Sequence, residues 1–246
     1  MSSTIAAQKV VLVTVGNSGV GYETCLTIAK HGGYHVMLAG RSADRVHAAA
    51  ERVRAQAAAT STVEEALLDF ASLKSVHDFA VELKTRNDIS SLSTLVCNAG
   101  VTNSSKVMTT DGLESTFGVN HLGHFLLVRL LRDITKRVVV VSSETHDPEE
   151  HAPAPPPNAS DLDKVAFGHE PPSIPLKHVD VSAVIAHCKA YGIRVNTSEA
   201  AGAFLAGLVL EVDWQAKQWT NGEYFRVDAI AKTSVQSRDP ALAREL

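Results

Sequence analysis

The sequence predicts an α/β fold built on a doubly wound parallel sheet, and three observations support this fold class. Residues 10–15 form a continuous, β-branched apolar run, as expected of a strand buried on both faces of a parallel sheet. A glycine-rich turn from Thr14 to Gly21 follows this run and leads into a helical pattern over residues 22–31. Strand and helix patterns then alternate as far as Ser143, which indicates right-handed crossovers between parallel strands.

The same alternation sets the expected order of elements. Strands are predicted at residues 10–15, 35–39, 63–68, 92–97 and 137–141, and helices at residues 22–31, 44–59, 73–84, 111–132 and 197–211. Ser42 is expected to cap the second helix and Thr197 the last one. Asp111 with Glu114 has the form of a capping box for the longest helix. A final strand is expected to begin near residues 221–225.

Length and composition fit one intracellular domain. The chain has 246 residues and 45% hydrophobic residues, enough to bury a single core over residues 1–246. Its formal net charge of −4, with interspersed signs, argues against nucleic acid or an anionic membrane as a partner. The three cysteines include no CxxC pair and are expected to be reduced, with Cys25 and Cys97 in apolar surroundings. Residues 1–8 lack the features of a secretory signal and no apolar run is long enough for a membrane span, so we expect a cytoplasmic protein.

The turn after the first strand predicts a dinucleotide site. A glycine-rich turn between a buried strand and a helix directs free backbone N–H groups and the positive helix end at a diphosphate. At the end of the second strand there is no acid at Ala39 or Gly40, and Arg41 comes next. An acid there would bind a ribose 2′-hydroxyl, whereas a guanidinium pairs with a 2′-phosphate, so the sequence favours NADP over NAD. The alternative is that Arg41 is a solvated residue that starts the next helix.

Several separate motifs then occur in one order along the chain. They are Thr14 to Gly21, Arg41, Asp69, the Cys97-Asn98-Ala99-Gly100 run, the segment 111–125 with Asn120, and Val141-Ser142-Ser143. In these motifs, over residues 9–147, the chain resembles the short-chain dehydrogenase/reductase family, in the branch that includes retinol dehydrogenases. The resemblance implies a Rossmann fold and an NAD(P)-dependent oxidoreductase.

The resemblance also implies roles for individual residues. Those expected to line the diphosphate are Gly16, Ser18, Gly19, Val20 and Gly21. Those expected at the rest of the cofactor are Arg41 at the 2′-phosphate, Asp69 and Phe70 at the adenine, and Asn98, Ala99 and Gly100 behind the nicotinamide ribose. Asn120 is expected to hold the helix backbone and a proton-relay water, and Ser143 to hydrogen-bond the substrate oxygen.

The glycine turn departs from the family pattern at its first glycine. The usual pattern is Thr-Gly-x-x-x-Gly-x-Gly, but Val15 stands in the first glycine position and Gly16 comes one place later. If that position requires a positive φ angle, a β-branched residue there is strained. Either the turn shifts to use Gly16 or dinucleotide affinity falls, and we expect the shift.

A second departure concerns the proton donor. The family uses a Tyr-x-x-x-Lys motif on the helix after Ser143, in which the lysine lowers the tyrosine pKa. None of the four tyrosines has a lysine four residues on. Tyr191 is the remaining candidate by position, but Val195 follows it at that spacing. A loop over residues 144–177, with eight of the nine prolines, takes the place of this helix, and residues 178–246 resemble a truncated C-terminal half.

Three functional hypotheses remain open. The first is an NADP-dependent short-chain oxidoreductase that interconverts a carbonyl and an alcohol on a small or medium apolar substrate, with Ser143 and Asn120 in the active site. The second is a catalytically impaired nucleotide-binding remnant, from a deletion, a splice form or an incorrect gene model. The third is the same fold used for imine reduction or cyclisation.

Metal and assembly are constrained less directly. The residues that could suggest zinc are His121, His124, His146 and His151. They belong to segments that are not expected to meet, and no carboxylate spacing supports a site. Surface or packing roles are therefore expected for these histidines, and no metal is expected. A homo-oligomer remains an option, although one of the two helices that the family uses for assembly is altered. Unless residues 193–196 supply a sixth strand, residues 223–227 must pair beside residues 137–141 or leave that edge open.

Overall fold

Five parallel strands form the centre of the computed structural model, which describes residues 8–103, 105–142, 166–167, 198–210, 224–226 and 229–231. The strands are β1 (Lys9–Thr14), β2 (Tyr34–Gly40), β3 (Thr62–Leu67), β4 (Thr94–Cys97) and β5 (Val138–Val140). They pair in the order β3-β2-β1-β4-β5, and every pair is parallel. The predicted doubly wound sheet is therefore confirmed. Its strand order reverses between β1 and β4, the point of such sheets where ligands bind.

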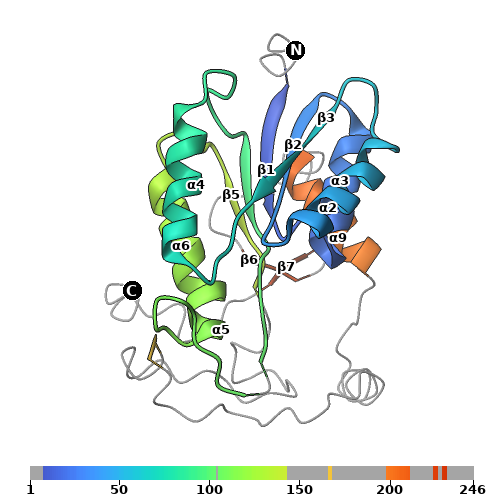
Figure 1. The fold of residues 1–246 in the computed structure, drawn as a ribbon. Coiled ribbons are helices and arrows are strands. Elements are labelled where there is room, and N and C mark those ends of the chain that lie inside the picture. Colours follow the sequence, from blue (N-terminus) through green and yellow to red (C-terminus); the bar gives the residue numbers. More distant parts are fainter. Residues whose placement is uncertain are drawn as a thin grey trace, which may run out of the picture.

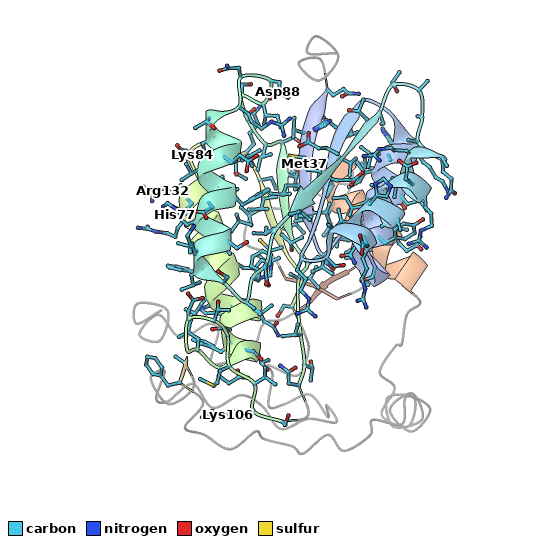
Figure 2. The ribbon with its side chains drawn as sticks, viewed as in Figure 1. Met37, His77, Lys84, Asp88, Lys106 and Arg132 are labelled. Carbon is cyan, nitrogen blue, oxygen red and sulfur yellow. The ribbon has the colours of Figure 1, made fainter. Side chains whose placement is uncertain are left out.

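Helices cover both faces of the sheet (Figure 1). One face carries α2 (Gly19–His31), α3 (Ala43–Arg54) and α9 (Ser198–Leu210), and the other carries α4 (Leu73–Thr85) and α6 (Gly123–Leu131). In Figure 2 the labelled Asp88 lies at the end of the sheet where the strands begin, and Lys106 lies beyond the end where they finish. The candidate site residues follow the carboxyl ends of β1, β2, β3 and β4, so they belong to this second end.

Alternate residues of β1 pack into different cores. Val10 and Leu12 belong to the core under α4 and α6, whereas Val11 and Val13 belong to the core under α2, α3 and α9. All four are at most 6% exposed. Because successive strand residues point to opposite faces, a strand between two helical layers must be apolar at every position, which explains the continuous apolar run.

The last described helix, α9, packs directly on α2. A Cβ atom placed on Gly202 would overlap the Cβ of Glu23 and come within 3.0 Å of the Thr24 nitrogen, so glycine permits this close approach. Thr24 Oγ1 donates to Val20 O over 2.7 Å and lies 3.4 Å from the Gly202 carbonyl oxygen. Leu205 and Leu208 are buried in the core under α2, α3 and α9, called the second core below, and Phe204 packs against it. The predicted helix is thus confirmed, while its expected cap, Thr197, lies outside the described residues.

The helix predicted over residues 111–132 is wrong in its first part. Gly112 has a φ of 76°, and the helical segment begins only with α5 (Ser115–Phe117), followed by a π turn, η1 (Gly118–Leu122), and α6. Glu114 is itself the N-cap, because its carboxylate oxygens accept hydrogen bonds from Thr116 N and Phe117 N at 2.9 and 2.8 Å.

The predicted capping box is wrong for the same reason. Asp111 Oδ2 instead accepts a hydrogen bond from Leu73 N over 2.8 Å, and so satisfies a free amide at the start of α4. Other helix starts also differ from expectation. Ser42 precedes α3, but its side chain makes no capping bond. Helix α2 begins at Gly19, three residues before the predicted start.

The C-terminal strand does not extend the main sheet. Strand β6 (Tyr224–Arg226) pairs antiparallel with β7 (Ala229–Ala231) in a separate two-stranded sheet. Among the described residues, β4 is the one strand that pairs with β5. Over the described residues the outer edge of β5 is open, and Val140 of β5 is 66% exposed. Residues 193–196 lie outside the described part of the chain.

Candidate nucleotide-binding site

The turn after β1 keeps a left-handed residue at Val15. This residue has a φ of 51°, whereas Gly16 is not among the residues with positive φ. The expected shift of the turn onto Gly16 is therefore wrong. A left-handed conformation costs an L-residue about 1–2 kcal/mol, and a β-branched side chain adds to the strain. Gly16 is needed for another reason, because a Cβ there would lie 2.9 Å from both Cys25 Sγ and Leu38 Cγ.

The start of α2 is open to a ligand. Gly19 has a φ of 53°, and a Cβ placed on it would meet no atom within 4 Å. Ser18 is the exposed N-cap residue, but its hydroxyl makes no capping hydrogen bond. The first amides of a helix have no intrahelical acceptor, so α2 presents unpaired N–H groups together with the positive end of its dipole. An anion such as a diphosphate is the group that this end of a helix binds.

Close packing fixes the far side of the turn. A Cβ on Gly21 would overlap the Val15 carbonyl oxygen and lie 2.5 Å from Asn98 Nδ2. The Asn98 side chain in turn donates to the Thr14 carbonyl over 3.0 Å. Val20 is half-buried and packs against the second core. Gly21 therefore permits the turn to lie directly on the end of β4.

The Thr14 hydroxyl joins the ends of β1 and β4. Its Oγ1 accepts hydrogen bonds from Asn98 N and Ala99 N, both at 2.8 Å. Thr14 is fully buried, so these bonds are shielded from water. The Asn98 to Gly100 segment is thus held against the glycine turn at the point where the strand order reverses.

Asn120 fixes the continuation of this segment. Its Oδ1 accepts from Val101 N over 2.7 Å and its Nδ2 donates to Val101 O over 2.9 Å. Asn120 lies in η1, where Gly123 N donates to Gly118 O, five residues back. Such π turns occur often at functional sites. Asn120 therefore ties the helix to the residue after Gly100, consistent with the expectation that it holds backbone in place.

Arg41 is exposed just beyond the end of β2. Within the described part of the chain, no hydrogen bond or ion pair holds its guanidinium. The neighbouring Gly40 packs under Asn17, since a Cβ on Gly40 would lie 2.7 Å from Asn17 Oδ1. The glycine turn and the Arg41 segment therefore lie side by side.

Of the two residues expected at the adenine, only Asp69 has a partly accessible side chain. Asp69 is half-buried and its Oδ1 accepts from Ala71 N over 2.9 Å. Phe70 is 5% exposed, and its ring lies 4.3 Å from the His124 ring, centroid to centroid. The Phe70 ring belongs to the core and is not free to stack on a purine, which corrects the expectation for its side chain.

His124 is the site residue that sequence reasoning missed. Expected as a packing or surface histidine, it is 7% exposed, with Nε2 3.1 Å from Thr14 Oγ1 and Nδ1 3.2 Å from Asn120 O. Burial lowers the pKa of His124. Its neighbour His121 stacks with the rings of Phe117 and Phe125 at centroid distances of 5.2 and 6.5 Å, and burial lowers the pKa of His121 too. No local motif marks His124, because its partner Thr14 is 110 residues away.

Other expected residues have simpler outcomes. Cys25 and Cys97 are buried free thiols, and burial raises both pKa values, that of Cys97 to about 12. They are core residues, as predicted. Ser143, Tyr191 and Cys188 lie outside the described residues, and Ser142 is exposed after β5. Over the described ranges, no cluster of residues could hold a metal ion and no helix is long and apolar enough to cross a bilayer.

Comparison with known proteins assigns the family. The model of the family described as short chain dehydrogenase matches residues 9–153 of the 246. The chain belongs to this family. The matched short-chain dehydrogenase region begins with β1 and contains all residues expected at the cofactor, as well as Asn120, His124 and Ser143.

Two curated relatives illustrate the similarity. The WW domain-containing oxidoreductase of Gallus gallus is 50% identical over 143 residues, which cover 56% of this chain and 34% of that protein. Retinol dehydrogenase 13 of Homo sapiens is 42% identical over 146 residues, covering 56% of this chain and 42% of that protein. This chain thus spans less than half the length of the curated relatives that it matches.

Solved structures share the fold over more of the chain. The crystal structure of an uncharacterized protein from Mycobacterium paratuberculosis has a TM-score of 0.63 and 26% identity, covering 97% of this chain and 90% of that one. A metagenomic short-chain oxidoreductase in complex with NADP has a TM-score of 0.55 and 16% identity, covering 85% and 94%. At that identity the second similarity shows the fold alone.

Proposed function

We propose that this short-chain dehydrogenase binds NADP at the carboxyl ends of β1, β2 and β4. The observation that carries the proposal is the uncapped start of α2 beside Gly19. A diphosphate can approach this backbone because Gly19 has no Cβ, and a Cβ placed there would meet no described atom within 4 Å. Ser18 would add its free hydroxyl, and Gly21 permits the close packing on which the turn depends.

The choice of NADP over NAD rests on Arg41. An exposed guanidinium beside the glycine turn can form a bidentate pair with a 2′-phosphate, and Ala39 and Gly40 offer no carboxylate to a 2′-hydroxyl. Asp69, whose side chain is partly accessible, would lie at the adenine. Asn98, Ala99 and Gly100 would lie behind the nicotinamide ribose.

With the cofactor bound, the proposed reaction interconverts a carbonyl and an alcohol on a small or medium apolar substrate. The nicotinamide supplies or accepts the hydride. Asn120 holds the segment after Gly100 through both atoms of its amide, and Ser143 is proposed to donate a hydrogen bond to the substrate oxygen. The curated relatives are named as an oxidoreductase and a retinol dehydrogenase, which supports a reaction of this class.

A second candidate function is nucleotide binding without turnover. Carbonyl reduction delivers a hydride to carbon and a proton to oxygen, and the family's proton donor is the tyrosine of Tyr-x-x-x-Lys. No tyrosine in this sequence has a lysine four residues on. This single observation favours the second candidate, in which the cofactor half remains functional and the reaction is lost.

Cofactor binding is tested by titrating NADPH and NADH and following their fluorescence. We expect Arg41→Ala to weaken NADPH binding by about 10- to 100-fold, the worth of a charge-assisted pair, and to leave NADH binding nearly unchanged. Arg45→Ala is the matched control, since Arg45 is also exposed, at the start of α3. Equal losses for both nucleotides would contradict the role of Arg41.

Turnover is tested by NADPH oxidation with a panel of ketones and aldehydes. The enzyme hypothesis requires carbonyl-dependent oxidation that decreases in Ser143→Ala. Tight NADPH binding with no oxidation on any member of the panel would reject it in favour of the second candidate. The absence of NADPH binding would reject both.

A further inference from the structure

His124 connects three parts of the candidate site through its two ring nitrogens. Nε2 lies 3.1 Å from Thr14 Oγ1, at the end of β1, and Nδ1 lies 3.2 Å from the carbonyl oxygen of Asn120, in η1. Thr14 Oγ1 also accepts from the amides of Asn98 and Ala99, after β4. The ring is buried and packs on Phe70, so water does not compete for these hydrogen bonds.

The partners of His124 determine where its proton lies. A carbonyl oxygen can only accept, so Nδ1 must carry a hydrogen and donate it to Asn120 O. Thr14 Oγ1 has two lone pairs, and the amides of Asn98 and Ala99 occupy both. Its hydroxyl proton must therefore be donated to Nε2, which has to be unprotonated. Only the neutral ring with hydrogen on Nδ1 satisfies every partner.

We propose that His124 is a positioning residue of the nucleotide site, which in its neutral, Nδ1-protonated form orients the Thr14 hydroxyl and locks the Asn98 to Gly100 segment against the glycine turn. The inference rests on the proposed nucleotide binding, because this segment is the expected wall behind the nicotinamide ribose. The same ring donates to the main-chain oxygen of Asn120. The side-chain amide of Asn120 in turn bonds Val101 N and Val101 O, so His124 also supports the residue that holds Val101.

The surroundings of His124 favour the neutral ring. The groups that face it from β1, from the end of β4 and from the segment before α4 are Thr14, the Asn98 and Ala99 amides through Thr14, and Phe70, none of which carries a charge. On its own helical segment, His121 is the titratable group whose charge acts on His124. Burial is the main cause that lowers the pKa of His124, the His121 charge adds to it, and the hydrogen bonds to the backbone of Asn120 and Val119 act in the opposite direction. A charged ring would direct a second N–H at a Thr14 oxygen that has no free lone pair.

The position of the proton can be measured without nucleotide. In ¹H–¹⁵N spectra of the full chain labelled at histidine, the two neutral tautomers and the imidazolium give different nitrogen shifts. We expect His124, assigned by its absence in His124→Gln, to show the Nδ1–H form at pH 7. A signal from the Nε2–H form or from the imidazolium would overturn the inference, whether or not the protein binds NADPH.

The positioning role is tested by NADPH affinity in two variants. Glutamine can accept from Thr14 through its Oε1, so His124→Gln should bind NADPH within about threefold of wild type, whereas His124→Leu should lose about 5- to 100-fold, as expected for a buried donor left unpaired. In a double-mutant cycle, Thr14→Val should cost less affinity in the His124→Leu background than in wild type. His121→Gln is the matched control and should bind as wild type does.

The outcomes separate the two proposals. Wild-type protein that binds no NADPH contradicts the proposed function. Wild-type binding combined with equal affinities in His124→Leu and His124→Gln, or with additive effects in the cycle, contradicts the positioning role of His124 alone. Unfolded His124→Leu would be recognised by circular dichroism, and the tautomer signal and His124→Gln would then decide.

Discussion

The Nε2 atom of His35 lies 3.0 Å from the carboxylate of Glu64, and this pair joins β2 to β3 at the end of the sheet opposite the glycine turn. The His35 Nδ1 atom lies 2.7 Å from Thr62 Oγ1, whose own proton is donated to Gln8 Oε1 over 2.7 Å. Thr62 must therefore accept from Nδ1, while the carboxylate of Glu64 can only accept from Nε2. Both ring nitrogens of His35 therefore face hydrogen-bond acceptors.

The described part of the chain contains two buried histidines with different hydrogen-bond partners. His35 and His124 are 2% and 7% exposed, respectively. His35 contacts a carboxylate, whereas His124 contacts a carbonyl and a hydroxyl that must donate.

The free energy of unfolding should depend on pH through Glu64. Burial opposes its ionisation, but hydrogen bonds from His35 and Arg86 outweigh burial and lower the pKa of Glu64 from 4.5 to about 2. The unfolded chain takes up this proton first, so the stabilisation is complete above the unfolded pKa and is lost as pH falls from about 4.5 toward 2. Urea unfolding of wild type and Glu64→Gln should differ most at pH 6–7, and the difference should shrink at pH 4. The exposed Glu82→Gln is the control, and a difference that grows toward acid pH would contradict this assignment.

Substitutions at Val15 should show the left-handed backbone directly. Val15→Gly and Val15→Ala both remove the side chain, but only glycine adopts a φ of 51° without strain. We expect the glycine variant to be more stable than the alanine variant by about 1 kcal/mol. At Val20, inside α2, the order should reverse by about 1 kcal/mol because glycine is a poor helix former. Thermal unfolding of the four variants measures both differences, and the same order at the two positions would show that Val15 is not left-handed in solution.

Two glycines of the turn should respond differently to alanine. Gly19→Ala adds a Cβ that meets no described atom within 4 Å, so it should cost little beyond the strain of its φ, about 1–2 kcal/mol, yet obstruct the path of a diphosphate. Gly21→Ala drives a Cβ into the Val15 carbonyl and Asn98 and should reduce both stability and NADPH binding. NADPH titration and thermal unfolding on the same samples separate the two effects. Unchanged NADPH affinity in Gly19→Ala would place the diphosphate elsewhere.

The N-cap at Glu114 gives a test of the observed start of the helix. Glu114→Ala removes the acceptors of Thr116 N and Phe117 N and should cost about 1–2 kcal/mol in the free energy of unfolding, with Glu114→Gln in between. Asp111→Ala should instead destabilise through the freed amide of Leu73. Denaturant titration measures each value. A null effect of Glu114→Ala would be hard to reconcile with a helix that begins at Ser115.

The sequence was sufficient to predict the strands, because burial on both faces makes β1, β2 and β4 largely apolar runs. It was also sufficient for the glycine turn, since few other residues fit where Gly21 meets Asn98. Helix starts were less predictable. The Asp111 and Glu114 spacing matches a capping box, but a positive φ at Gly112 separates the two residues and sends Asp111 to another helix.

Contacts between distant segments explain the other differences. Nothing in the sequence around Phe70 indicates that its ring packs in the core against His124. Likewise, nothing in the sequence around His124 indicates that Thr14 lies beside it. At Val15, local sterics predicted a shift that the structure does not make. The hydrogen bond from Gly16 N to Ala39 O and the close packing of Gly16 against Cys25 hold the turn in its original register. Tertiary constraint has here overruled a local backbone preference.

The π turn from Gly118 to Leu122 sets the rotational phase of the helical segment. Each residue of an α-helix advances the chain by about 100°, so the additional residue that η1 accommodates turns all of α6 by about that angle relative to α5. Asn120 can therefore reach Val101 while Leu127 and Leu131 still point into the core. A one-codon deletion within this turn would leave the composition of the helix almost unchanged, and yet it could not keep both contacts at once. The length of this segment is consequently under a stricter constraint than the identity of most of its residues.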